Sequence, residues 1–132
     1  MIIDTSALIA VLRGEPEASD FVAALAESTD STMSAGSYLE ASIVVDANRD
    51  PVLSARFDEL IDVAAIKIVP FDADTARVAR QAYRDYGKGT GHPAGLNLGD
   101  CFAYALARIT GEPLLCKGND FVHTDIRLVA FD

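Results

Sequence analysis

The chain has 132 residues and a formal net charge of -9 at pH 7, and 50% of its residues are hydrophobic. This length fits a single domain, residues 1–132, with a sizeable core. No apolar run approaches the roughly 18 residues that a membrane span requires, and the N-terminus lacks the basic segment and long apolar region of a signal peptide. The sequence therefore predicts a soluble, cytoplasmic protein with no membrane partner.

The acidic balance argues against a nucleic-acid partner. Twenty acidic residues against eleven basic ones repel a phosphate backbone if the charges are evenly spread. Divalent cations bound at an acidic cluster, or a basic stripe elsewhere on the surface, reverse the sign of the charge locally. The chain has candidates for both features.

The cysteine and histidine residues indicate no site of their own. Cys101 and Cys116 have neither C-x-x-C spacing nor a histidine at zinc-finger spacing. Two buried, reduced thiols are therefore expected rather than a disulfide or a zinc site. His92 and His123 have no serine or cysteine nucleophile at a recognisable motif, so neither is assigned a catalytic role.

Apolar residues at helical spacing, with Gly, Pro, Asp or Asn near the ends, predict six helices. Pro16 is well placed as the first residue of the second helix. In the third helix, Leu39, Ile43, Val44 and Ala47 are expected on the apolar side, which either packs into the core or, like that of the fourth helix, supports association. The predicted helices span residues 5–13, 16–28, 34–48 or 37–48, 52–64, 75–86 and 97–110.

Short apolar runs between these helices predict strands at residues 1–3, 66–71, 113–116 and 126–131. Strands that alternate with helices form βαβ units, which give a mostly parallel sheet covered by helices on both faces. The expected fold is α/β, a three-layer α/β/α sandwich. The glycine-rich segment 87–95 is expected to be a surface loop.

Asp4 directly follows the first apolar run, where an acid faces away from any core. Ligands of open α/β sheets bind just beyond the carboxyl ends of the strands, so a carboxylate at this point favours a bound cation. A second interpretation is that Asp4 only caps the helix that begins at Thr5 or Ser6, by accepting a hydrogen bond from a free amide. The partners of Asp4 decide between the two.

Three further acids, Glu40, Asp100 and Asp120, lie near strand ends or helix starts that can converge with Asp4. Each also has a purely structural explanation. Glu40 completes a capping-box pattern with Ser37, Asp100 lies where a helix dipole favours negative charge, and Asp120 can shape a turn. If the elements are neighbours, the four carboxylates meet in one pocket.

A cluster of carboxylates needs a cation, because neighbouring negative charges repel and raise one another's pKa values. Mg2+ and Mn2+ prefer oxygen ligands, and Mg2+ commonly binds through one or two carboxylates together with water and substrate phosphates. The reaction class that follows is metal-assisted hydrolysis of phosphodiesters. Ser6, two residues beyond Asp4, either holds a water or an acid at this site or caps the helix.

Four sequence blocks together resemble the acidic blocks of PIN-domain ribonucleases, and more narrowly those of VapC toxins from bacterial type II toxin–antitoxin pairs. No single block is specific, but their order and spacing match over essentially the whole chain. The blocks are Met1–Leu8 with Asp4, Ser37–Ala41 with Glu40, Leu98–Ala105 with Asp100, and Leu114–Phe121 with Asp120.

This resemblance implies a metal-dependent endoribonuclease that cleaves structured RNA with Mg2+, or with Mn2+ in its place. It also implies a homodimer, and a hetero-oligomer in which the C-terminal segment of a VapB-like antitoxin occupies the acidic groove and inhibits the enzyme. By position, Asp4, Glu40, Asp100 and Asp120 match the catalytic and metal-binding acids of the family. Ser6 matches the small polar residue that accompanies the first Asp.

One position departs from the family's pattern. Family members often have consecutive acids where this chain has Asn119 and Asp120. The resemblance therefore leaves open whether Asp120 binds the metal directly or through water, with Asn119 in a supporting role. Asp125, which lies nearby in the sequence, is expected in a turn or cap.

Four basic residues recur at helical spacing on, or just beyond, the fifth predicted helix. They are Arg77, Arg80, Arg84 and Lys88. Together with Tyr83 and Tyr86, they predict an RNA-binding stripe that tracks phosphates and offers stacking faces on the way to the acidic pocket. The alternative is an ordinary solvated helix face.

Other classes of function stay open at this level. A signalling receiver domain also has a parallel sheet, an acidic pocket, Mg2+ and a lysine after a late strand, here Lys117. It requires an acceptor Asp at the end of a middle strand, whereas Asp72 comes only after a proline, and the acid pair expected after its first strand is missing. A haloacid-dehalogenase-like phosphatase requires Asp-x-Asp, and residue 6 is Ser. A catalytically silent interaction module, whose acids only cap helices, predicts binding that persists without metal.

Overall fold

The computed structural model describes residues 1–131, so residue 132 of the predicted domain lies outside the described part. Within that part, four short strands form one parallel sheet in the order β3-β2-β1-β4. β1 is therefore a central strand, with β2 on one side and β4 on the other. The strands are β1 (Ile2–Ile3), β2 (Thr32–Ser34), β3 (Lys67–Val69) and β4 (Leu114–Leu115).

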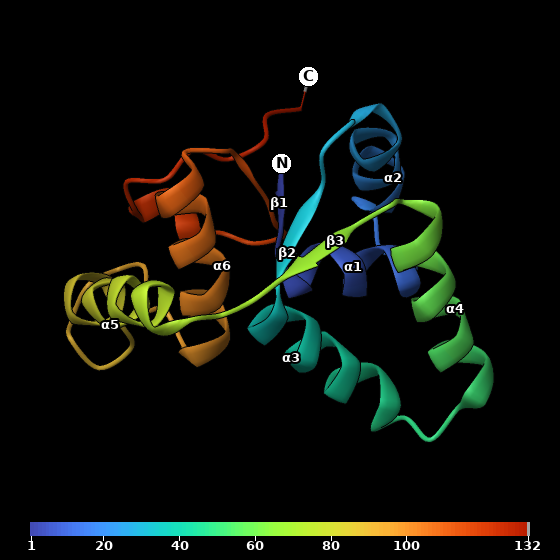
Figure 1. Ribbon diagram of the computed structural model, residues 1–132, viewed down its shortest axis with the longest axis horizontal. Coiled ribbons are helices and arrows are strands. Elements are labelled where there is room, and N and C mark those ends of the chain that lie inside the picture. Colours follow the sequence, from blue (N-terminus) through green and yellow to red (C-terminus); the bar gives the residue numbers. More distant parts are fainter. Residues whose placement is uncertain (132) are drawn as a thin grey trace.

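In residues 1–131, two helices connect each strand to the next one in the chain. The helices are α1 (Thr5–Leu12), α2 (Ala18–Glu27), α3 (Ala35–Asp46), α4 (Pro51–Val63), α5 (Ala73–Tyr86) and α6 (Leu98–Thr110). Figure 1 shows α5 and α6 on one side of the sheet and α1, α2 and α4 on the other. The predicted three-layer α/β sandwich with a parallel sheet is confirmed. None of the helices in the described part is long and apolar enough to cross a membrane.

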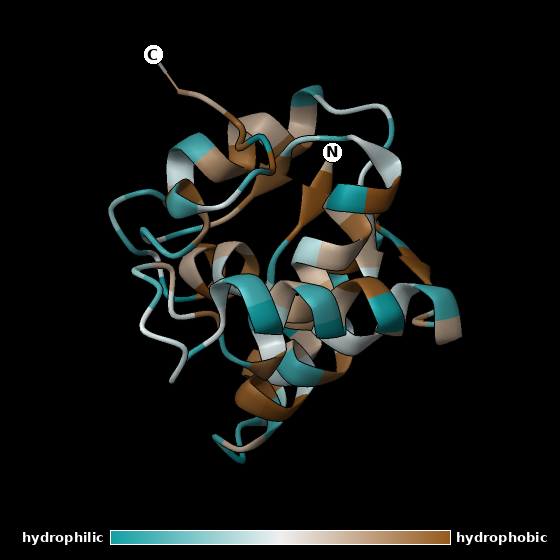
Figure 2. Ribbon diagram, turned by 90° about the vertical axis from the view of Figure 1, so that its left-hand side faces the viewer, coloured by the Kyte–Doolittle hydropathy of each residue, from teal (hydrophilic) through white to brown (hydrophobic). Residues whose placement is uncertain are grey.

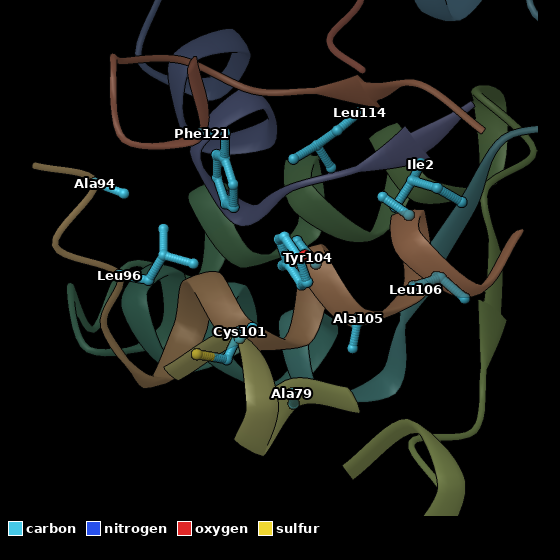
Figure 3. Packing of buried hydrophobic residues seen from close by; sticks show 13 residues of the cluster. Ile2, Ala79, Ala94, Leu96, Cys101, Tyr104, Ala105, Leu106, Leu114 and Phe121 are labelled. Atoms are coloured by element: carbon cyan, nitrogen blue, oxygen red, sulfur yellow. The ribbon is translucent and has the colours of Figure 1, made fainter. Parts of the chain in front are cut away.

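Successive residues of the central strands face opposite helical layers, as the pleat of a strand requires. Ile2 and Leu114 belong to one apolar cluster with residues of α5 and α6, and Ile3 and Leu115 belong to a second cluster with residues of α1 to α4. Figure 3 shows the first cluster, with Tyr104 of α6 among the side chains beside the two strands. Burial on both faces explains why β1 and β4 read as short apolar runs.

Two predictions about strands are wrong. β2 was not expected, because Thr32 and Ser34 are polar and interrupt the apolar run that indicates a buried strand; both are buried nevertheless. The last predicted strand, at 126–131, does not form. Within the described residues, it contributes one isolated bridge between Leu128 and Leu114.

The helices agree with the predicted ranges to within two residues at each end; α5, for example, begins at Ala73 rather than at Thr75. α2 begins at Ala18 rather than at Pro16. Of the two expectations for the apolar side of α3, core packing is wrong for Leu39 and Ile43, which are 60% and 61% exposed, while Ala41 and Val45 are buried. Two large apolar side chains of this helix are thus left on the surface.

The chain order places the topological switch point of the sheet at the carboxyl end of β1. From β1 the chain passes to β2 and then to β3, and it later crosses to β4 on the other side of β1. In open parallel sheets, ligands bind where the connections leave neighbouring strands in opposite directions. Asp4 is the first residue beyond β1, and Cys116 is the first beyond β4.

Candidate active site

Asp4 is buried at the switch point, with 4% of its surface exposed. Its amide donates a hydrogen bond to the carbonyl oxygen of Leu115 at 3.0 Å and so continues the sheet. Its Oδ2 accepts a hydrogen bond from the Ser6 amide at 3.1 Å, so the predicted N-cap of α1 is confirmed. Within residues 1–131, both hydrogen bonds to the carboxylate go to Oδ2. The cap thus leaves Oδ1 available to a cation.

The Ser6 hydroxyl connects the two loops that leave β1 and β4. It donates a hydrogen bond to Asp4 Oδ2 at 2.5 Å and accepts one from the Lys117 amide at 2.9 Å. The Lys117 ammonium group forms ion pairs with Glu15 and Glu17, in the connection between α1 and α2. These contacts fix the position of the loop after β4 relative to Asp4.

Glu40 lies in the second turn of α3 and places its carboxylate on the first turn of α6. A Cβ atom added to Gly99 would lie 1.8 Å from Glu40 Oε2, so the carboxylate fills the space that a side chain at residue 99 would need. The capping-box interpretation of Glu40 is wrong. The N-cap of α3 is Ser34, whose hydroxyl accepts a hydrogen bond from the Gly36 amide at 3.2 Å.

Asp100 is the third residue of α6 and forms a capping box with Asn97. The Asp100 amide donates to Asn97 Oδ1 at 2.9 Å, and the Asn97 amide donates to Asp100 Oδ2 at 3.0 Å. The predicted position at a helix start is confirmed. One carboxylate oxygen is engaged in the box, which fixes the side chain and leaves Oδ1 for other partners.

Asn119 and Asp120 lie on the exposed loop after β4. Gly118 has a φ angle of 101°, a left-handed conformation that a side chain would strain, and it turns the chain before Asp120. Asp120 stands at the start of a short 3-10 helix, Phe121–His123, but makes no side-chain cap hydrogen bond. Its carboxylate is therefore not committed to the local backbone.

The charges of neighbouring acids act on Asp4 and Asp100, the two acids of the site whose pKa values are raised. Burial raises the pKa of Asp4 to about 6; the two hydrogen bonds from Ser6 oppose this shift, and the charges of Asp100 and Glu40 add to it. Burial also raises the pKa of Asp100, and the charges of Asp120 and Glu40 raise it further. The structure thus places Asp100 and Glu40 near Asp4 at the carboxyl end of β1, and Asp120 near Asp100.

The thiol of Cys116 lies in the field of the same acids. Burial raises the pKa of Cys116 to about 12, and the charges of Asp4, Asp100 and Asp120 add to the shift. The thiol therefore stays protonated at neutral pH and is a poor nucleophile. Cys101 and Cys116 are both free, as predicted, although Cys116 is half-buried rather than buried.

The chemistry of the four acids fits a hard divalent cation. Within residues 1–131, no ion pair neutralises any of them. Burial and neighbouring negative charge penalise the ionised forms of Asp4 and Asp100, and a bound cation would offset this penalty. No group of three or more Asp, Glu, His or Cys side chains in that part of the chain forms a set that could hold a metal ion. Mg2+ needs no such set, because it binds through one or two carboxylates and keeps several waters.

The predicted basic stripe lies along α5, on the side of the molecule that Figure 2 shows, where hydrophilic residues dominate this helix. All four of its basic residues are exposed. They are Arg77, Arg80, Arg84 and Lys88. Arg77 pairs with Asp74 at 2.7 Å, whereas the other three have no ion pair within residues 1–131. Tyr83 is exposed, but Tyr86 packs against other aromatic rings.

Two neighbours of the acids, Gly99 and Cys116, were not linked to the site by sequence reasoning, and Lys117 was considered only as the lysine of a receiver domain. Gly99, Cys116 and Lys117 each follow or precede a predicted acid by a few positions, and this proximity was the available signal. Asp125, expected in a turn or cap, lies in a bend, where it accepts a hydrogen bond from the Tyr104 hydroxyl and pairs with Arg108.

Comparison with known families identifies the class of the protein. A family model described as the PIN domain matches residues 1–127. The chain therefore belongs to the PIN-domain family, which removes the receiver-domain and phosphatase alternatives.

Within that family the chain belongs to the VapC group. Ribonuclease VapC28 of Mycobacterium tuberculosis is 54% identical over 127 residues, which cover 96% of each chain. Ribonuclease VapC30 of the same organism is 51% identical over 130 residues, which cover 98% of each chain. The identification of a VapC-type PIN toxin from the four acidic blocks is confirmed.

Solved structures show the same fold at low sequence identity. M. tuberculosis VapC20, described as a sarcin-ricin loop cleaving toxin, superposes with a TM-score of 0.73 at 15% identity over 97% of both chains. FitAcB from Neisseria gonorrhoeae has a TM-score of 0.71 at 20% identity and covers 98% of this chain and 96% of that chain. A toxin–antitoxin complex from Klebsiella pneumoniae has a TM-score of 0.66 at 20% identity and covers 91% of this chain and 88% of that chain.

Proposed function

We propose that this chain is a metal-dependent endoribonuclease, the toxin of a type II toxin–antitoxin pair, acting in the cytoplasm as a single domain over residues 1–132. The observation that carries the proposal is the convergence of four carboxylates at the switch point of the sheet, where no basic side chain of the described residues pairs with them. The VapC relatives, which are named ribonucleases, support RNA as the substrate. The sarcin-ricin loop, which VapC20 is described as cleaving, is an example of a structured RNA target.

In this proposal Asp4 and Asp100 hold Mg2+, or Mn2+ in its place, and Glu40 and Asp120 complete the site directly or through water. The bound cation supplies a Lewis acid for the phosphodiester and lowers the pKa of an attacking water. Ser6 orients Asp4 and favours its ionised form through two hydrogen bonds.

Asp100 is oriented by its capping box with Asn97, so its free oxygen points from a fixed helix start. Asn119 supports Asp120 from the adjacent position of the same loop. The protonated thiol of Cys116 contributes no charge beside them. The site thus consists of two firmly held acids and two, on α3 and the loop after β4, that adapt to the cation and the RNA.

The basic stripe on α5 supports RNA binding by an otherwise acidic protein. Four of the eleven basic residues fall within twelve consecutive positions, 77–88. Arg80, Arg84 and Lys88 are exposed and unpaired within residues 1–131, so they are available to phosphates. Since α5 packs on α6, the helix that carries Asp100, a strand of RNA held on α5 lies on the same side of the sheet as this acid.

A cognate VapB-like antitoxin is the proposed inhibitor. α2 and α4 border a surface pocket of about 280 Å³, lined by apolar residues that include Val22, Leu25 and Leu60. Val63, which also lines it, is 78% exposed. An amphipathic helix recognises such a groove through its apolar face, and the Klebsiella pneumoniae neighbour is a toxin–antitoxin complex. In this proposal the antitoxin fills the groove and its C-terminal segment continues to the acids.

A homodimer is the proposed form of the toxin. The exposed residues Leu39 and Ile43 of α3 and Leu98 of α6 line a pocket of about 420 Å³, with Glu40 at its edge. Large apolar side chains gathered on a surface indicate an interface. A second copy that covers them would bring two acidic sites close together within the toxin–antitoxin hetero-oligomer.

The proposal is tested by incubating purified, antitoxin-free protein with total RNA in Mg2+, in Mn2+ and in EDTA, beside Asp4→Asn and Asp100→Asn. We expect cleavage in either metal, none in EDTA, and a loss of at least about a hundredfold in each variant, because each removes a proposed metal ligand. Cleavage in EDTA, or full activity in both variants, contradicts the proposed mechanism. Binding of RNA without cleavage, unaffected by EDTA, supports a silent interaction module instead.

A further inference from the structure

Gly99 lies directly beneath the carboxylate of Glu40. A Cβ atom added to Gly99 would lie 1.8 Å from Oε2, 2.4 Å from Cδ and 2.6 Å from Oε1 of Glu40. All three atoms of the carboxylate therefore lie in space that is free because residue 99 has no side chain. We infer that Gly99 is a positioning residue, whose missing side chain allows Glu40 to join the acid cluster. The inference rests on the proposed function, since it gives Glu40 a place in the metal site.

The backbone of α6 does not itself require glycine at this position. Gly99 is the second residue of the helix, and its φ angle lies outside the left-handed region. Helix propensity favours alanine over glycine. Gly99 disfavours helix formation, yet it stands at the point where Glu40 of α3 approaches α6 closely.

The start of α6 is also a favourable place for a carboxylate. The first turn of a helix carries amides without intrahelical partners and the positive end of the helix dipole, both of which favour negative charge. Glu40 reaches this point from α3, and its charge raises the pKa values of Asp4 and Asp100. The lack of a side chain at Gly99 thus determines whether the carboxylate of Glu40 lies close enough to act on Asp4 and Asp100.

An alanine at residue 99 is expected to move Glu40 rather than α6. The atoms in conflict are the far end of a flexible side chain, which can rotate towards solvent. Gly36 offers a control, because it is also the second residue of a helix and also has no room for a Cβ atom. A Cβ atom at Gly36 would lie 2.5 Å from the Phe102 ring, which packs edge to face against Phe71 with centroids 4.8 Å apart. Alanine at residue 36 therefore disturbs the packing of Phe102 on Phe71, and alanine at residue 99 alters the site.

The first test needs no metal and no RNA. Melting temperatures are measured in EDTA for the wild type, Gly99→Ala, Glu40→Gln and the double variant. Glu40→Gln removes a charge that repels Asp4 and Asp100. We therefore expect the Glu40→Gln variant to melt at a higher temperature than the wild type. In the Gly99→Ala background, where Glu40 has already left the cluster, we expect no further rise. An equal rise in both backgrounds overturns the inference.

The second test uses metal-dependent cleavage of RNA. We expect Gly99→Ala to lower the rate by roughly tenfold or more, as loss of a supporting partner of a metal site does, and to raise the Mg2+ concentration needed for half-maximal activity. The double variant with Glu40→Gln should be no slower than the slower single variant. Gly36→Ala should melt at a lower temperature yet keep the wild-type Mg2+ requirement.

The inference is overturned if Gly99→Ala cleaves RNA at the wild-type rate and with the wild-type Mg2+ requirement. Failure of the proposed function gives a different result, namely no metal-dependent cleavage by the wild type. In that event the melting temperatures in EDTA still decide whether Gly99 holds Glu40 within the acid cluster.

Discussion

The Ser6 hydroxyl donates a 2.5 Å hydrogen bond to Oδ2 of Asp4, the most buried acid of the site. The same hydroxyl accepts a hydrogen bond from the Lys117 amide, so its single proton is directed to Asp4. This contact favours the ionised carboxylate, although burial still raises the pKa of Asp4 to about 6. Ser6, for which the sequence also allowed a role as a helix cap, thus favours the charged form of Asp4, the proposed metal ligand.

Removal of this hydroxyl should shift the pH dependence of cleavage. In Ser6→Ala the pKa of Asp4 should rise above its value of about 6, because the side-chain hydrogen bond that lowers it is lost. Metal binding requires the ionised form, so the acidic limb of the pH–rate profile should move to higher pH, and activity at pH 6 should fall more than at pH 8. Ser6→Thr, which keeps a hydroxyl, is the control. If the pH–rate profiles of Ser6→Ala and the wild type differ only by a constant factor at every pH, Ser6 does not lower the pKa of Asp4.

The metal-free protein should become more stable when Asp4 loses its charge. The folded pKa of Asp4 is about 6, above the ordinary value of 3.8. The folded state therefore binds more protons between these pH values, and stability falls as the pH rises through this window. At about 1.4 kcal/mol per pKa unit, ionised Asp4 costs up to about 3 kcal/mol at pH 7.

Asp4→Asn should accordingly raise the free energy of unfolding in EDTA by about 1 to 3 kcal/mol at pH 7 and by little at pH 4, as measured by urea denaturation. Saturating Mg2+ should stabilise the wild type and not the variant. Asp58→Asn, on an exposed site of α4, is the control and should show neither effect. A gain that is equal at both pH values would show that the burial of the charge is not its cause.

The acids that follow strands or begin helices could be predicted because local sequence fixes those positions. Asp4 follows an apolar run that forms β1, and Asp100 follows the N-cap Asn97. The direction of the parallel strands then places such residues at one edge of the sheet. No local pattern contains the approach of α3 to α6, so the contact of Glu40 with Gly99 was not foreseen. For the same reason, the choice between core packing and an exposed surface for Leu39 and Ile43 stayed open.

The wrong predictions about strands have a related cause. β2 consists of three residues, two of them polar, and it is a strand because β1 and β3 hydrogen-bond to it on either side. The segment 126–131 has the composition of a strand, yet it forms one bridge to Leu114 within the described residues. Pairing partners decided both outcomes, and they lie far away in the sequence.

The stripe on α5 should account for a measurable part of the salt dependence of RNA binding. Arg80 and Arg84 are exposed and unpaired within residues 1–131. Each phosphate contact on single-stranded RNA contributes about 0.7 to the slope of log K against log salt. The double variant Arg80→Gln/Arg84→Gln should therefore lower the slope by about 1.4 in filter-binding titrations with catalytically inactive Asp100→Asn protein. Arg56→Gln, on α4, is the control; an unchanged slope in the stripe variant contradicts RNA binding at α5.

The exposed side of α3 should determine the oligomeric state. Ile43 is 61% exposed and lines the same pocket as Leu39 and Leu98. A charge placed in a buried interface is strongly unfavourable without a partner, so Ile43→Glu should convert the proposed homodimer to a monomer in sedimentation or light-scattering measurements. Because the side chain faces solvent in the isolated chain, the melting temperature of the monomer should change little. A wild type that is monomeric at all concentrations contradicts the proposed dimer.

The binding of Mn2+ to the antitoxin-free protein tests the central claim most directly, because it depends on the acid cluster and not on RNA. Electron paramagnetic resonance or calorimetric titration should show saturable binding to the wild type at pH 7.5. Binding should be weakened by at least tenfold in Asp4→Asn and in Asp100→Asn, as the loss of a carboxylate ligand requires, and unchanged in Asp58→Asn. Equal affinities of the wild type and both site variants would contradict a metal site at the carboxyl end of β1.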